Sequence, residues 1–273
     1  MRNRLKASTL ESKFPVLSVE HDCIISKDAD ITVCFGVELP ELFSLTSGEY
    51  EAMHSAWLKA IKVLPNYTVI LKQDWFTEEI YRPKIQKDDM SFLDRSFERH
   101  FNERPYLHHN CYLFITKTTK ERMRQQSNFN TLCRGFLVPK EMQDKDTAVR
   151  FLEAVAQLES IVNDNGFVKL TRLKTGDIVG TDENAGIIEK YFSLTQEDPV
   201  SLSDIDLDPG EMKIGSKYLC LHTLSDVDDL PAVVGTDSRY EKLSTDRSDC
   251  RLSFAAQVGL LLNCNHMYNQ YIF

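Results

Sequence analysis

Glycine and proline are scarce in this sequence, in which 273 residues include only 11 glycines and nine prolines. Collagen and Pro/Gly-rich low-complexity chains need far more of both residues, so these classes are excluded. Hydrophobic residues make up 42% of the chain and charged residues 27%, which is ordinary globular usage. A chain of this length buries roughly 70–75% of the surface that its unfolded form exposes, so it can fold without a metal or a disulfide.

Long apolar runs and paired cysteines are also absent. The longest apolar runs, such as residues 258–262, are far shorter than the roughly 20 residues that span a bilayer. The seven cysteines include no C-x-x-C pair, and most lie in apolar segments, where a reduced thiol behaves as a small hydrophobic residue. We therefore expect a soluble cytoplasmic protein without a disulfide framework.

Positive charge is in deficit, because 32 Lys and Arg residues stand against 41 Asp and Glu residues, for a net charge of −9. Nucleic-acid affinity depends on cations that neutralise phosphates, so we expect no direct nucleic-acid contact. One segment, 117–134, is locally basic; its cations are Lys117, Lys120, Arg122, Arg124 and Arg134. We interpret it as a solvated excursion, and a DNA-contacting adaptor that acts through Lys117–Arg134 is the alternative.

Phosphate-binding glycine loops are missing as well. A P-loop needs G-x-x-x-x-G-K-[ST], whereas the segment 176–181 has the wrong spacing and no lysine. The patterns G-x-G-x-x-G, H-E-x-x-H and G-x-S-x-G do not occur. We therefore predict no catalytic residue, no cofactor and no metal for this chain.

Two segments contain metal-ligand residue types without the pattern that a metal needs. The acidic segment 204–208 resembles the start of a calcium loop, but Pro209 stands where the loop needs glycine and Gly215 where it needs glutamate. The His108–His109 pair is close to Cys111, but neighbouring strand residues point to opposite faces. We interpret the first segment as a solvated acidic loop and the two histidines as strand residues.

The order of secondary-structure signals predicts an α+β fold. Thr46 and Glu49 have the spacing of a capping box, which marks the start of a helix. The expected elements are strands at 23–26 and 31–39, a helix from Thr46 to Leu64, a strand at 67–75, a helix from Asp88 or Asp89 to Pro105, and a strand at 110–118. This β-β-α-β-α-β order favours mixed, largely antiparallel sheets with helices packed on one side.

Two of these helices carry apolar residues at helical spacing. Trp57 belongs to the first helix, and the second carries Met90, Leu93, Phe97 and Phe101 along one face. Such stripes usually face a core, so we expect both to be buried.

We divide the chain into four parts: an N-terminal α+β subdomain at 1–136 with an excursion at 119–134, a helix–strand–helix unit at 137–195, an acidic loop at 196–212, and a β-rich segment at 213–273. Strand–helix alternation recurs in both halves, so two related α/β subdomains are an alternative to a single fold. The final residues are aromatic and uncharged, whereas chain ends are usually polar, so we expect the chain to be cut from a longer protein.

Five blocks of sequence suggest a known family. They are PVLSVEHDCIISKDADITVCFGVELPELFSLT at 15–46, LKQDWF at 71–76, HHNCYLFITKTTKERMRQQSNFNTLCRGF at 108–136, NAGIIEKYFSL at 184–194 and CNHMYNQYIF at 264–273. Together they resemble the N-terminal region of the TraG ATPase of bacterial conjugative transposons, a relative of the large ATPases of type IV secretion.

That resemblance implies a non-catalytic assembly module at the inner face of the cytoplasmic membrane. The implied partners are other subunits of the conjugation apparatus, among them a small inner-membrane protein, and the full-length ATPase would self-associate. ATP and Mg²⁺ would bind in a downstream motor domain, whose Walker motifs this chain lacks. The competing interpretation is a stand-alone enzyme with an Asp/His site that residue spacing does not reveal.

Three aromatic residues at the end of the strand at 67–75 or after it are candidates for partner contacts: Trp75, Phe76 and Tyr81. Interface cores are enriched in aromatic residues, which favours this role. Burial in the core is the alternative interpretation for all three.

Overall fold

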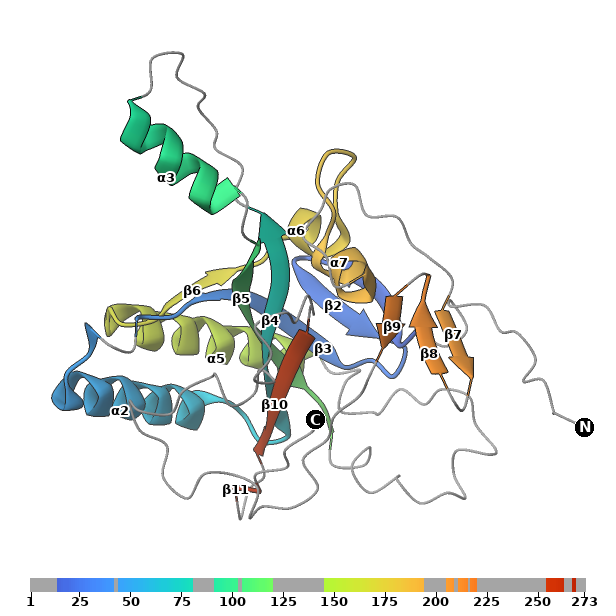
Figure 1. The fold of residues 1–273 in the computed structure, drawn as a ribbon. Helices are drawn as coiled ribbons and strands as arrows, with labels where there is room; N and C mark the ends of the chain where they lie inside the picture. Colours follow the sequence, from blue (N-terminus) through green and yellow to red (C-terminus); the bar gives the residue numbers. More distant parts are fainter. Residues whose placement is uncertain are drawn as a thin grey trace, which may run out of the picture.

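The computed structural model describes residues 14–41, 44–80, 91–102, 105–119, 145–193, 205–208, 211–215, 217–219, 254–262 and 267–268. The strands within these residues form an eight-stranded sheet and a three-stranded sheet, and every pairing between them is antiparallel (Figure 1). The predicted fold class, α+β with largely antiparallel sheets, is confirmed.

The large sheet runs in the order β1 (Val16–Glu20), β2 (Cys23–Ser26), β3 (Ile31–Glu38), β5 (Pro105–Lys117), β4 (Thr68–Ile80), β10 (Phe254–Leu262) and β11 (Met267–Tyr268). The strand β6 (Lys169–Arg172) pairs with the second half of β3, beyond β2. The unit predicted at 137–195 therefore contributes a strand to this same sheet. The sequence pattern missed β1, because its five residues alternate too briefly to differ from a loop.

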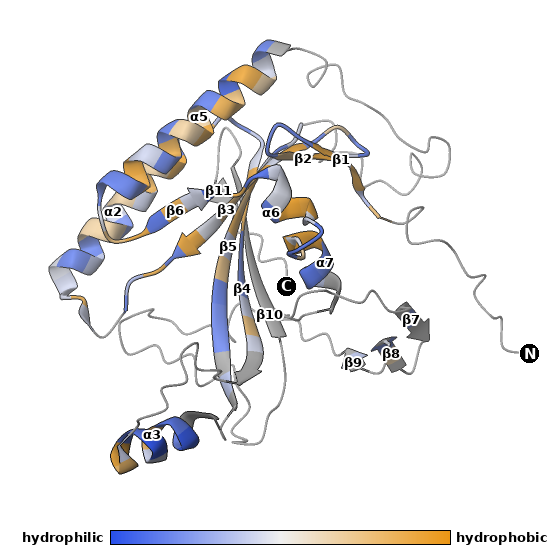
Figure 2. Ribbon diagram, turned by 90° about the horizontal axis from the view of Figure 1, so that it is seen from above, coloured by the Kyte–Doolittle hydropathy of each residue, from blue (hydrophilic) through white to orange (hydrophobic). Residues whose placement is uncertain are grey.

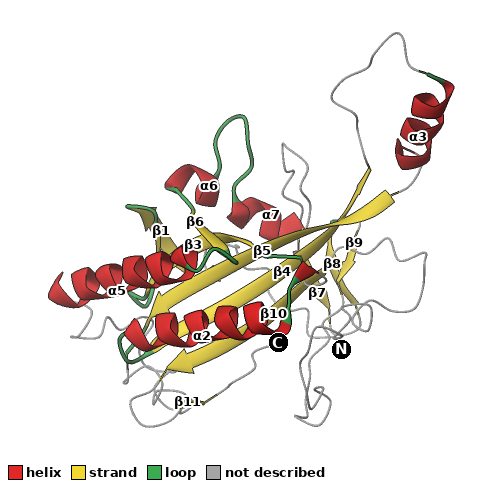
Figure 3. Ribbon diagram, turned by 90° about the vertical axis from the view of Figure 1, so that its left-hand side faces the viewer, coloured by secondary structure: helices red, strands yellow, loops and turns green. Residues whose placement is uncertain are grey.

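Two long helices lie side by side on one face of the large sheet (Figures 2 and 3). They are α2 (Ser47–Val63) and α5 (Lys145–Asp164). The capping box predicted for α2 is confirmed: the Glu49 N–H donates to Thr46 Oγ1 at 3.3 Å, and the Thr46 N–H donates to Glu49 Oε2 at 2.8 Å. No described helix is both long and apolar enough to cross a membrane.

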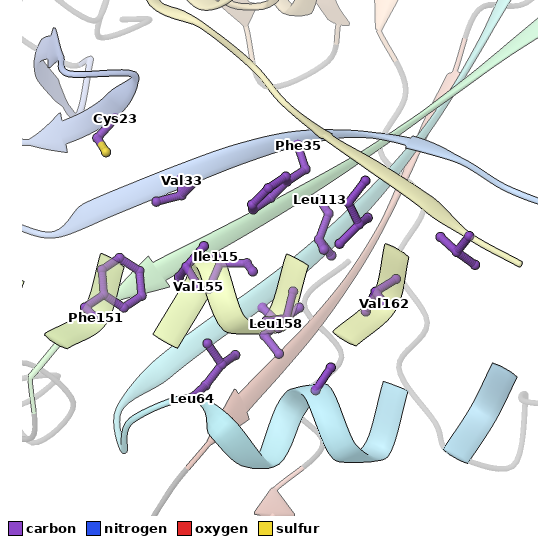
Figure 4. Close-up of a cluster of buried hydrophobic side chains, with 14 residues drawn as sticks. Cys23, Val33, Phe35, Leu64, Leu113, Ile115, Phe151, Val155, Leu158 and Val162 are labelled. Atoms are coloured by element: carbon purple, nitrogen blue, oxygen red, sulfur yellow. The ribbon is translucent and has the colours of Figure 1, made fainter. Parts of the chain in front are cut away.

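The main hydrophobic core lies between these two helices and the sheet (Figure 4). Alternate residues of β3 and β5 point into it, including Phe35 and Ile115, which are fully buried. Phe151 and Leu158 of α5 meet them from the helix side and are also fully buried. Trp57 of α2 packs against this core, as its place on the helical stripe predicts.

A second, smaller core occupies the opposite face of the sheet. There the short helices α6 (Thr175–Val179) and α7 (Ile187–Ser193) cover strand residues that alternate with those of the main core. Its buried members are Cys34, Trp75, Ile178 and Ile187. The long helices thus share one side as predicted, and these two short helices lie on the other (Figure 2).

The strands β4 and β5 are the longest in the sheet, with 13 residues each. At 3.3 Å per residue such a strand extends about 43 Å. Residues 77–80 and 105–108 pair with each other and with no other described strand, and we call this two-stranded extension the arm. The helix α3 (Phe92–Asn102) lies beyond the arm, apart from α2 and α5 (Figures 1 and 3).

The small sheet consists of β7 (Ile205–Asp208), β8 (Glu211–Ile214) and β9 (Lys217–Leu219). It occupies part of the segment predicted to be an acidic loop. In β7 isoleucine and leucine alternate with aspartates, and this period of two is typical of a strand. The acidic composition of the segment had instead favoured a loop.

The close packing of the turn between α6 and α7 allows a prediction about stability. A Cβ atom on Gly186 would lie 2.3 Å from Gly180 N and from Val179 C, so backbone atoms would have to move. We expect Gly186→Ala to destabilise the fold by about 1–3 kcal/mol, which corresponds to a loss of roughly 2–4 °C in Tm per kcal/mol.

The matched control is Gly48→Ala, because a Cβ atom on Gly48 meets nothing within 4 Å at the start of α2. Thermal unfolding should leave this variant unchanged or slightly more stable. Equal melting temperatures for the two variants would contradict the packing described for the turn.

Candidate functional site

A polar cluster on β4 and β5 continues the face of the sheet that carries the main core. Every second residue of a strand shares a face, so Lys72 and Asp74 follow the core residue Ile70 along β4. The register sets Cys111 of β5 opposite Asp74, with His109 two residues earlier on the same face. A lysine, an aspartate, a histidine and a cysteine are therefore gathered where the arm leaves the sheet.

Asp74 is the centre of this cluster. Its Oδ1 lies 2.9 Å from His109 Nε2, and its Oδ2 accepts a hydrogen bond from Lys72 Nζ. Only 10% of the Asp74 side chain is exposed, against 34% for both Lys72 and His109. The ring of Phe76 stacks on the His109 ring, with centroids 4.6 Å apart. The carboxylate thus lies between the Lys72 amino group and the His109 imidazole.

These contacts keep Asp74 charged. Burial by itself raises the pKa of the carboxyl group, but the hydrogen bond with His109 and the positive charge of Lys72 outweigh burial, so the pKa of Asp74 lies below its usual value. The group is therefore ionised at neutral pH.

The Cys111 thiol is not an activated nucleophile. Burial raises the pKa of Cys111 to about 12, so the sulfur keeps its proton at neutral pH. Burial also raises the pKa of Cys23, and that of Cys34 to about 12. These three are buried free cysteines, as expected of small hydrophobic residues. The other cysteines, which lie outside the described residues, are Cys133, Cys220, Cys250 and Cys264.

Metal binding finds no support in the part of the chain that the structure describes, which contains no group of three or more His, Cys, Asp or Glu side chains placed to hold an ion. The two histidines of β5 turn to opposite faces, as predicted. His109 meets Asp74, whereas the ring of His108 lies 6.4 Å from that of Tyr106.

The three aromatic residues predicted to contact partners have different surroundings. Trp75 is fully buried, with its ring 5.1 Å from Tyr112 and 5.7 Å from Tyr191 of α7, so a partner role for it is wrong and the core alternative holds. Strand alternation places it on the face that α6 and α7 cover. Phe76 is half-buried against His109, and its partner role remains a prediction. Tyr81 lies outside the described residues.

The basic segment begins with a buried residue. Lys117 is 7% exposed, and its Nζ donates to the Asn66 carbonyl oxygen at 2.6 Å and lies over the Tyr67 ring. It therefore ties β5 to the turn before β4 and is not available to DNA. The remaining cations, from Lys120 to Arg134, lie outside the described residues.

The prediction that the apolar face of α3 is buried is wrong. Leu93 and Phe97 of the predicted face are 76% and 66% exposed, and Phe92, which was not part of that face, is 80% exposed. We call Phe92, Leu93 and Phe97 the α3 stripe. Ser91 caps the helix, because its Oγ accepts the Asp94 N–H at 3.2 Å. Asp88, Asp89 and Met90 lie outside the described residues, and the side chain of Phe101 is not described. The helix ends at Asn102, before the predicted end at Pro105.

The cluster makes a prediction about stability and pH. Asp74→Asn leaves Lys72 and His109 without their carboxylate, so we expect a loss of about 1–3 kcal/mol in the free energy of unfolding at pH 7. Because the pKa of Asp74 is lowered in the folded state, its contribution is complete above the ordinary pKa and is lost as the pH falls through the folded pKa. The difference between the two proteins should therefore shrink below about pH 4.

Urea denaturation at several pH values measures this difference. Asp182→Asn, at an exposed loop position, is the control and should be neutral. A variant Asp74→Asn that matches the unsubstituted protein at pH 7 would show that the cluster does not stabilise the fold.

One family model matches part of the chain: residues 3–55 match the family described as "Domain of unknown function, B. Theta Gene description (DUF3875)". In the described structure these residues include β1, β2, β3 and the first half of α2. No curated protein matches the chain.

Proposed function

We propose that this chain is a non-catalytic assembly module of a conjugative-transfer, or type IV secretion, ATPase, and that it docks the motor at the inner face of the inner membrane. The five sequence blocks that resemble the TraG family support this proposal. Two of them, 15–46 and 108–136, contribute β1–β3 and most of β5 to the large sheet. ATP and Mg²⁺ belong to a downstream motor domain in this proposal.

The α3 stripe is the observation that carries the proposal. Large apolar side chains gathered on an exposed surface are typical of a protein–protein contact. The stripe lies beyond the arm, so a partner reaches it without disturbing either core (Figures 1 and 3). The partners that fit are other subunits of the conjugation apparatus, including a small inner-membrane protein, and further copies of the full-length ATPase.

Co-purification from conjugating cells tests this role. We expect Leu93→Gln combined with Phe97→Gln to lose at least about 90% of the conjugation membrane subunits that co-purify with the chain, because these two large apolar side chains are exposed neighbours on one face of α3. Leu58→Gln combined with Val149→Gln is the matched control, since these residues are exposed on α2 and α5.

Both double variants should keep the melting temperature of the unsubstituted chain. Full recovery of the membrane subunits by the α3 variant would show that the stripe is not the surface that binds them. Failure of the unsubstituted chain to recover any of them would overturn the proposed function itself.

We also expect the chain neither to bind nor to hydrolyse ATP. A triphosphate site needs several backbone N–H groups and a lysine. At the glycine-containing start of α6, the Lys174 N–H already donates to the Asp177 carboxylate at 2.9 Å, and that negative charge would repel phosphate. Calorimetry with millimolar ATP and Mg²⁺ should show no saturable heat, and a micromolar Kd would contradict this prediction.

The Asp74–His109 pair favours a second candidate, a stand-alone enzyme that uses the imidazole as a general base. Lys72 occupies the second carboxylate oxygen and the Cys111 thiol keeps its proton, so the described cluster pairs the base with no activated nucleophile. An activity screen in which His109→Ala abolishes turnover without changing stability would favour this candidate over the assembly module.

A further inference from the structure

We draw no further inference here: the strongest candidate, the exposed apolar surface patch that the α3 stripe forms beyond the arm, is bordered by residues of both charges, and nothing in the described part of the chain shows what covers it.

Discussion

The antiparallel ladder between β4 and β5 is the interaction on which the rest of the structure depends. On one side β5 pairs with β3, and on the other β4 pairs with β10, so the large sheet is assembled around these two strands. Alternate residues of the same pair supply both cores, with Ile115 under the long helices and Trp75 under α7. Because the ladder continues beyond its neighbours as the arm, it also places α3 away from both cores (Figure 3).

One face of this ladder changes from apolar to polar along its length. Near α2 and α5 it is an apolar core, and where the arm begins it carries Asp74 with its two partners. A buried carboxylate is tolerated only when it is paired, and a slip of one residue would move every side chain to the other face. The Asp74 cluster therefore favours a single register at the point where fewer strands support the ladder.

Local signals in the sequence were sufficient to predict some elements and not others. Thr46 and Glu49 are three residues apart, so the capping box of α2 could be predicted. The period of α3 identified which residues share a face, but whether that face is buried depends on what packs against it, and periodicity does not contain this information. The Asp74–His109 pair joins residues 35 positions apart and depends on strand register. The charges of Lys72 and Asp74 inside an apolar strand were the one available signal.

The central claim is that α3 is a docking element for a subunit at the membrane, and site-specific photo-crosslinking in conjugating cells tests it most directly. A benzophenone amino acid incorporated in place of Phe97 should form a covalent adduct with a membrane-embedded subunit of the apparatus. The same amino acid in place of Tyr218, which is 72% exposed on the small sheet, should form none. No adduct at position 97, or equal adducts at both positions, would contradict the account.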